Sequence, residues 1–300
     1  MNNRIKVLTI ICSIISLTIC AVLFLEIKKL MPSGNTFAVP NKPVQNTEVK
    51  VDKQPIHVED TVEKEKEEKI KEDNASHHLD KPKEKVDLNK KVVYLTFDDG
   101  PSHNTERILD TLKEFNVKAT FFVIGNDTEY GKSLYRRIVD EGHAIGNHSY
   151  SHRYSKIYKS IDAYKEDTER LGKLLNSVIG FEPRIMRFPG GSNNLVSRRY
   201  SNKKTYMKEL CDEMINDGYE YYDWNVSAGD CVSGVKPAAA IVRDVVQGVK
   251  NKKRAVILFH DSEVRTTTAE AVPEIIKQLK AMGYEFRVLT ETSPALKFKN

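Results

Sequence analysis

The stretch VVYLTFDDGPS, residues 92–102, decides how the rest of the chain is interpreted. Its first half is apolar and β-branched, which is typical of a buried strand. The strand ends in two adjacent carboxylates, Asp98 and Asp99, and a Gly-Pro break follows them. Two neighbouring anions repel each other, so a partly buried pair must take up a proton or share a cation. The stretch therefore predicts a strand that ends at a cation site.

Short β-rich runs alternate with helix-like stretches from residue 91 onward. The predicted strands are residues 92–97, 119–124, 143–147, 185–188, 219–226, 255–260 and 285–289. The predicted helices are residues 106–115, 161–179, 203–217, 238–250 and 269–282, with capping glycines expected at Gly142, Gly180, Gly218 and Gly283. This alternation indicates an α/β fold with a parallel sheet covered by helices. Seven such units favour a barrel, or a barrel with a gap, over an open sheet.

Polar side chains gather at the ends of five of these predicted strands. The groups are Asp98-Asp99, Asn147-His148 with His152, Arg187 to Gly190, Asp223-Trp224, and His260-Asp261. In (β/α) barrels the chemistry lies at the carboxyl ends of the strands, so these groups are expected on one rim. Ser102 is better placed than either aspartate to cap the helix that follows.

His148 and His152 indicate how the charge of the acidic pair is balanced, because they can bind a cation together with it. Two imidazoles four residues apart can face one divalent ion, and a carboxylate from the first strand completes a His-His-Asp set. Zinc is the ion expected for these donors, and cobalt, nickel or manganese bind similar ones. The second aspartate remains free to act as a general base towards water.

Three further groups suit the hydrolysis of an amide or an ester. Arg187 is expected to orient the base carboxylate and keep it ionised. His260 is expected to be a general acid whose pKa is raised by a nearby carboxylate such as Asp223. A backbone N–H near Gly190 is expected to hold the oxyanion.

The residues from about 91 to 290 resemble the polysaccharide deacetylases of carbohydrate esterase family 4, the NodB-homology domain. The resemblance rests on five ordered motifs: TFDDGP (96–101), HSYSH (148–152), RFPGG (187–191), DW (223–224) and LFH (258–260). It implies a distorted (β/α)7 barrel and metal-dependent N-deacetylation of a polymer of N-acetylglucosamine.

The same resemblance implies a role for each site residue. Asp98 would be the base, and Asp99, His148 and His152 the metal ligands. Asp223 would tune His260, the acid, while Trp224 and Leu258 would line the pocket for the acetyl group. The family often has Tyr or Phe where Gly190 stands, which removes an aromatic wall of the cleft and puts substrate fit in question.

The amino-terminal third predicts an anchor and a tether. Residues 7–25 form an uncharged apolar run of 19 residues, long enough to cross a bilayer, and no convincing cleavage site follows it. Residues 31–89 are rich in charge and proline and are expected to stay solvated. We expect a signal anchor over residues 1–30, a flexible linker over residues 31–89, and a catalytic domain over residues 90–300, outside the cell on a single-pass membrane anchor.

Anchor and tether together resemble those of peptidoglycan N-acetylglucosamine deacetylases of Gram-positive bacteria. The expected partner is therefore a glycan polymer, with peptidoglycan ahead of chitin oligomers, a poly-N-acetylglucosamine exopolysaccharide or O-acetyl xylan. A membrane-tethered carbohydrate-binding module without turnover is the alternative from another class. The net charge of +5 comes without a nucleic-acid motif, and nothing indicates an obligate protein partner. Cys211 and Cys231 are equally compatible with a disulfide and with two free thiols.

Overall fold

The computed structural model describes residues 90–231 and 234–299. The predicted anchor and linker, residues 1–30 and 31–89, lie outside the described residues. Within the described ranges, no helix is both long and apolar enough to cross a membrane. Cys211 is buried and Cys231 is exposed, and both are free thiols, so the two do not form a disulfide.

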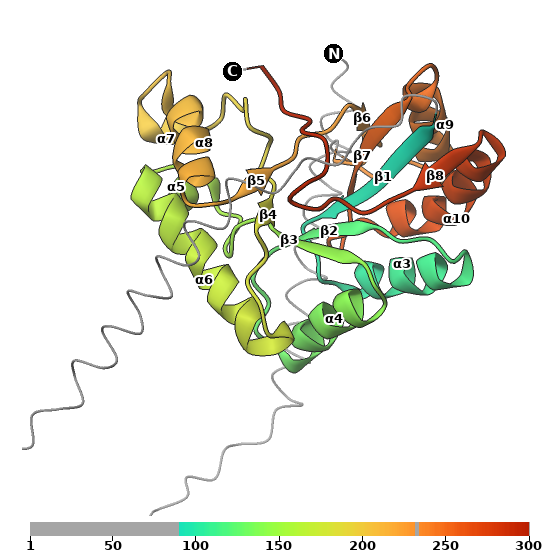
Figure 1. The fold of residues 1–300 in the computed structure, drawn as a ribbon, viewed down its shortest axis with the longest axis horizontal. Helices are drawn as coiled ribbons and strands as arrows, with labels where there is room; N and C mark the ends of the chain where they lie inside the picture. The colour runs from blue at the N-terminus through green and yellow to red at the C-terminus, as the bar shows by residue number, and fades with distance from the viewer. Residues whose placement is uncertain (1–89, 232–233, 300) are drawn as a thin grey trace, which may run out of the picture. The chain divides into compact units, whose positions relative to one another are not determined.

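The described strands form one parallel sheet that curves into a half-barrel (Figure 1). They are β1 (Lys91–Asp98), β2 (Thr120–Val123), β3 (Ala144–Asn147), β4 (Ile185–Met186), β5 (Glu220–Tyr221), β6 (Val226–Ser227), β7 (Arg254–His260) and β8 (Tyr284–Phe286). The order across the sheet is β5-β4-β3-β2-β1-β7-β6, and β8 pairs with the first residues of β1. The expected α/β architecture is confirmed, with the strands arranged as an arc.

The arc has a gap between β5 and β6, where one continuous strand, residues 219–226, was predicted. That prediction is wrong, because β5 and β6 lie at opposite ends of the sheet and residues 222–225 cross between them. The Tyr222 N–H donates to the Met186 carbonyl on one side of the gap, and the Asn225 N–H donates to the Val256 carbonyl on the other. Instead of one long strand, the chain forms two short strands, β5 paired with β4 and β6 paired with β7.

The two faces of β1 explain how the sheet carries both a core and a site. Val93, Leu95 and Phe97 belong to the core cluster that includes buried residues of α3, α9 and α10. The alternate residues Thr96 and Asp98 point the other way, because successive side chains of a strand face opposite sides. Burial of large apolar side chains, each worth about 1.5–3 kcal/mol, fixes the register. Asp98 therefore faces the inside of the arc.

The helices cover the outer face of the sheet (Figure 1). They are α3 (His103–Glu114), α4 (Glu129–Asp140), α5 (Tyr154–Ile157), α6 (Ile161–Ile179), α7 (Arg198–Ser201), α8 (Tyr206–Asn216), α9 (Ala238–Val249) and α10 (Thr266–Ala281). The five predicted helices are confirmed within a few residues, whereas α4, α5 and α7 were not predicted. The four predicted capping glycines all adopt positive φ, between +77° and +84°, a conformation that favours glycine.

Ser102 caps α3, as predicted. Its hydroxyl accepts from the Asn104 N–H, and the Thr105 hydroxyl accepts from the Ser102 N–H in return. This reciprocal cap starts the helix immediately after the acidic pair, so the end of β1 cannot shift without disturbing α3.

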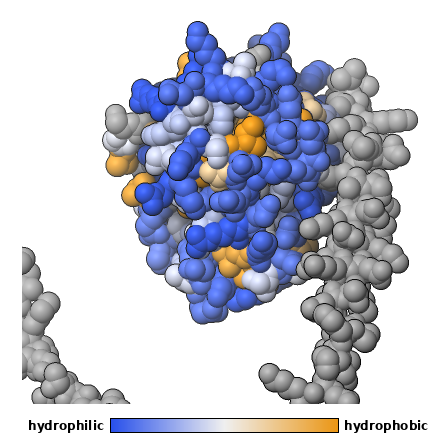
Figure 2. Space-filling model, turned by 90° about the vertical axis from the view of Figure 1, so that its left-hand side faces the viewer, coloured by the Kyte–Doolittle hydropathy of each residue, from blue (hydrophilic) through white to orange (hydrophobic). Residues whose placement is uncertain are grey.

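The surface over α5 to α8 is mostly hydrophilic, with only scattered apolar side chains (Figure 2). Leu195, Val196 and Tyr200 are among the large apolar residues that remain exposed. Single exposed apolar residues are normal on a soluble domain and indicate no interface by themselves.

Candidate active site

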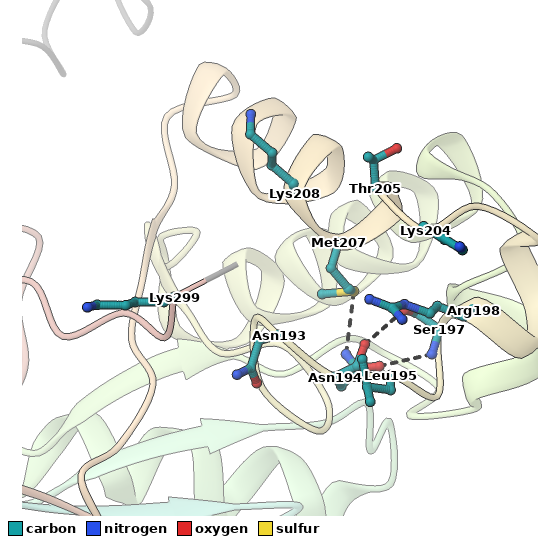
Figure 3. A pocket seen from close by; sticks show the side chains of 10 residues that line it. All are labelled: Asn193, Asn194, Leu195, Ser197, Arg198, Lys204, Thr205, Met207, Lys208 and Lys299. Carbon is teal, nitrogen blue, oxygen red and sulfur yellow. Dashed lines mark hydrogen bonds between the residues drawn. The ribbon is translucent and has the colours of Figure 1, made fainter.

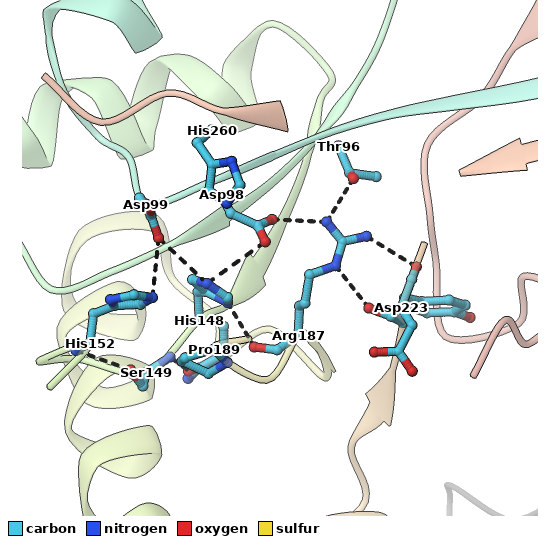
Figure 4. A network of polar contacts seen from close by, with 12 residues as sticks. Thr96, Asp98, Asp99, His148, Ser149, His152, Arg187, Pro189, Asp223 and His260 are labelled. Atoms are coloured by element: carbon cyan, nitrogen blue, oxygen red, sulfur yellow. Dashed lines mark hydrogen bonds and ion pairs between the residues drawn. The ribbon is translucent and has the colours of Figure 1, made fainter. Parts of the chain in front are cut away.

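Asp99, His148 and His152 meet at the carboxyl end of the sheet (Figure 4). The Asp99 Oδ1 atom lies 3.3 Å from Nε2 of His152 and 3.5 Å from Nε2 of His148. Asp99 follows β1 with a φ of +79°, and the histidines lie on the turn that follows β3. Positive φ is strained for a residue with a side chain and recurs at functional sites. The three donors that the sequence predicted as ligands therefore converge.

These three residues fit a divalent cation. Asp99 Oδ1 is buried and accepts no hydrogen bond, which leaves its charge uncompensated unless a cation shares it. Burial, reinforced by His152, lowers the pKa of His148 to about 3, so its imidazole is neutral. Nδ1 of His148 lies 2.8 Å from the Arg187 carbonyl, which leaves Nε2 free for a metal.

Asp98 lies beside this cluster and contacts Arg187. Its Oδ1 atom accepts from Nη1 of Arg187 at 2.8 Å, and its Oδ2 atom is 3.7 Å from Nε2 of His148. Burial raises the pKa of Asp98, and the positive charge of Arg187 offsets part of that rise. One carboxylate oxygen is thus held, and the other faces the metal-ligating residues.

Arg187 is completely buried and ties several strands to the site. Nη1 also donates to the Thr96 hydroxyl at 2.7 Å, and Nε donates to the Tyr222 carbonyl at 2.8 Å. The guanidinium stacks 4.3 Å from the centroid of the Phe122 ring. A buried cation with these partners is costly to leave unpaired, so Arg187 favours the ionised form of Asp98.

His260 lies across the site, at the end of β7, and is paired in register with Asp98 on β1. Its Nδ1 atom is 2.8 Å from Oδ1 of Asp230, and its backbone N–H donates to Oδ2 of the same carboxylate. Burial disfavours the charged imidazole, but the hydrogen bond and charge of Asp230 outweigh it and raise the pKa of His260 to about 9. The histidine is therefore protonated at neutral pH.

The expected pairing of His260 with Asp223 is wrong, because Asp230 occupies that position. Asp223 accepts instead from the Ser192 N–H at 2.9 Å, the Ser192 hydroxyl at 2.6 Å and the Phe298 N–H at 2.7 Å. Asp223 lies in the crossing between β5 and β6, and Asp230 follows β6 at the other side of the gap.

The two predicted pocket residues lie in different surroundings. Leu258 is buried on β7 two residues before His260, on the same face of the strand. Trp224 packs its ring edge-on against Phe298, with the centroids 4.9 Å apart. The Trp224 ring also lies 5.7 Å from the Arg187 guanidinium, which holds Asp98.

Gly190 lies beside the metal-ligating cluster. A side chain there would begin 2.9 Å from the Tyr154 hydroxyl oxygen, and the Tyr154 ring packs edge-on against that of His152. The Tyr154 hydroxyl thus lies where any side chain at position 190 would begin. The Gly191 N–H donates to the Phe188 carbonyl and the Ser192 N–H to Asp223, whereas the Gly190 N–H has no acceptor among the described residues.

Sequence reasoning missed the buried carboxylate Asp230, and it placed Asp261 on the rim without giving it a role. Asp261 accepts from the Thr105 hydroxyl at 2.5 Å, and burial, with Asp99 and Asp98 nearby, raises its pKa to about 7. Its Oδ1 atom has no hydrogen-bond partner among the described atoms. The signal was present in both cases, because each aspartate directly follows a strand or comes a few residues after one.

A pocket of about 320 Å³ lies on the loop after β4, and its lining includes Arg198, Lys204 and Lys299 (Figure 3). None of the residues predicted for catalysis or metal binding lines it. Its side chains are those of an open, cationic surface, so the chemistry belongs to the converging network of Figure 4.

Comparisons with known proteins agree with this geometry. Residues 85–208 match the family model described as polysaccharide deacetylase. The chain is 36% identical to a peptidoglycan N-acetylglucosamine deacetylase of Bacillus cereus over 207 residues, which cover 68% of this chain and 71% of the relative. It is 34% identical to the peptidoglycan N-acetylmuramic acid deacetylase PdaC of Bacillus subtilis, with 74% of this chain and 44% of the relative covered.

A solved structure extends the match to the fold. The catalytic domain of peptidoglycan N-acetylglucosamine deacetylase from Eubacterium rectale superposes with a TM-score of 0.68 at 36% identity, and the alignment covers 74% of this chain and 97% of that one. The chain belongs to the polysaccharide deacetylase family, whose members are hydrolases that remove acetyl groups from polysaccharides.

Proposed function

We propose that the protein is a metal-dependent deacetylase that removes N-acetyl groups from N-acetylglucosamine of peptidoglycan. The observation that carries the proposal is the convergence of Asp99 with His148 and His152 between a buried base, Asp98, and a protonated acid, His260. A divalent cation held by the three ligands, with zinc expected, would lower the pKa of water and polarise the acyl oxygen.

The residues around that cation divide the proton transfers. Asp98 accepts the proton of the attacking water on the oxygen that Arg187 does not hold. Its raised pKa makes it a stronger base than an exposed aspartate, and Arg187 keeps it ionised. The free N–H of Gly190 is the donor that we assign to the oxyanion.

His260 supplies the proton that the departing nitrogen needs. Nδ1 is engaged by Asp230, so the transferable proton is the one on Nε2. An amine is a poor leaving group unless it is protonated, and the pKa of about 9 keeps His260 charged at neutral pH. Base and acid thus come from adjacent strands, β1 and β7.

Peptidoglycan as the substrate and the membrane as the location rest on sequence and on relatives. Several relatives carry peptidoglycan deacetylase names, and one of these specifies N-acetylmuramic acid. The uncharged run of residues 7–25 and the charged stretch that follows it suit an anchored enzyme with its catalytic domain outside the cell.

Acetate release tests the proposal. The full-length chain is incubated with peptidoglycan, with chitin oligomers and with acetylated xylan, each with zinc and with a chelator. We expect acetate from peptidoglycan in the zinc samples alone, and free amines on glucosamine in the digested product. Amines on muramic acid would move the proposal to that sugar, and release that is insensitive to the chelator would overturn metal dependence.

A further inference from the structure

The residues Leu296–Phe298, here termed the carboxy-terminal strap, lie across the gap in the half-barrel. In Figure 1 the chain after β8 runs between β5 and β6. The Asp223 N–H donates to the Leu296 carbonyl at 2.8 Å, and the Phe298 N–H donates to the Asp223 carboxylate at 2.7 Å. Lys297 pairs with Glu220 at 3.0 Å on the β5 side. The strap is thus held by one backbone hydrogen bond, one hydrogen bond to the Asp223 side chain and one ion pair to β5.

Asp223 connects this strap to the loop that carries Gly190. One carboxylate oxygen accepts from the Ser192 N–H, and the other accepts from both the Ser192 hydroxyl and the Phe298 N–H. Asp223 is 1% exposed, so these three bonds replace its hydration. A buried carboxylate with three donors is rigidly held, and it transmits that rigidity to Ser192.

Packing connects the strap to the same loop a second time. A Cβ at Gly191 would lie 3.0 Å from the Phe298 ring and 3.1 Å from the Trp224 ring. Gly191 also has a φ of +87°. The two rings therefore pack tightly against the backbone of residue 191, and a larger residue there would have to displace them and adopt a strained φ.

The opposite side of the loop is held independently. The Tyr158 hydroxyl donates to the Pro189 carbonyl at 2.6 Å, and the Asn194 side-chain amide donates to the Gly191 carbonyl at 2.9 Å. The segment from Pro189 to Ser192 is thus held from both sides, and within the described ranges the Gly190 N–H between these contacts has no acceptor.

We propose that Asp223 and the carboxy-terminal strap are positioning elements that aim the Gly190 N–H at the oxyanion of the deacetylation reaction. This inference rests on the proposed function. In it, Asp223 acts on the reaction indirectly, by holding Ser192 and so the loop that carries Gly190. Trp224 packs against the same loop at Gly191.

Asp223→Asn in the full-length chain tests the hydrogen bonds. The amide oxygen of the new Asn can still accept from the Ser192 N–H. Its NH₂ group, however, is a donor that would face another donor, the Phe298 N–H, so that hydrogen bond is lost. Loss of one oxyanion donor costs about 10²–10³ in kcat, so a displaced donor should lower kcat about 10- to 100-fold. KM and zinc content should stay within about twofold, because substrate binding and the metal ligands are untouched.

The matched control is Tyr284→Phe. Its hydroxyl oxygen lies 2.7 Å from both the Val249 and the Lys252 carbonyl oxygens, which share its one hydrogen, and both are far along the chain from the loop. The control should lose stability in urea and keep its kcat. An Asp223→Asn variant that loses stability and keeps its kcat, as the control does, would overturn the proposal, as would a change confined to KM or to zinc content.

A double-mutant cycle tests the packing without any substrate. Gly191→Ala should lower the urea midpoint, and Phe298→Ala in the same chain should restore part of the loss by relieving the 3.0 Å contact. Additive effects of the two substitutions would overturn the contact between strap and loop. Because this readout needs no turnover, it separates failure of the strap from failure of the proposed function.

Discussion

The two sides of the catalytic rim are built in different ways. On one side, β1, β3 and β4 place Asp98, His148 and Arg187 at the ends of strands that follow the chain order across the sheet. On the other side, the chain leaves β5, crosses the gap and re-enters the sheet at β6, so Asp223 and Asp230 separate. Local motifs predict side-chain positions well where neighbouring strands pair in order, and poorly where the sheet is interrupted.

The largest effect is expected at the ordered side, from His148→Ala. Removal of one of three ligands should abolish cation binding and, with it, all acetate release above the chelated level. Zinc content by elemental analysis is the measurement. His103→Ala is the control, because that exposed histidine forms its ion pair with Glu263 and should leave the zinc content unchanged. Retained zinc in His148→Ala would mean that the metal lies elsewhere.

Asp98→Asn should lower kcat by about 10²–10⁴, the usual contribution of a general base, while the zinc content stays normal. The reason is that the new amide cannot accept the proton, whereas the three ligands remain. Asp140→Asn, at an exposed carboxylate of α4, is the matched control. Loss of zinc from Asp98→Asn would show that the two aspartates of the pair have been given each other's roles.

Asp230→Asn tests the interrupted side through pH. An acid works while protonated, so wild-type kcat/KM should fall as pH rises through about 9, the raised pKa of His260. Without the carboxylate, burial lowers that pKa, and the fall should begin at a lower pH. In Asp223→Asn, kcat/KM should begin to fall at the same alkaline pH as in the wild type. Equal shifts in both variants would restore Asp223 as the partner of His260.

The smallest effect is expected from the helix cap next to the acidic pair. Ser102→Ala removes the acceptor for the Asn104 N–H and should cost about 0.5–2 kcal/mol of unfolding free energy. Ser160→Ala, at the cap of α6, is the comparison. Urea unfolding should give the larger loss for Ser102, because its hydroxyl also donates to the Asp261 carbonyl. A larger loss for Ser160 would contradict this added role.

Sequence reasoning predicted the ordered half of the site because its signals are local. Asp99, His148 and His152 stand at strand ends within short motifs, and the capping glycines mark the helices between them. It failed for Asp223 because the run 219–226 looks like one strand, and only pairing with distant residues, such as Met186 and Val256, divides it. The contact of Asp223 with Phe298 has no local signal at all.

The direction of β1 has a consequence for how the enzyme meets its polymer. The strand begins at Lys91 and spans eight residues to the acidic pair, a length of about 26 Å at ~3.3 Å per residue. The peptide bond to residue 90 and the reactive rim therefore lie at opposite ends of strand β1. A tether joined at residue 90 would thus leave the rim clear for a polymer substrate.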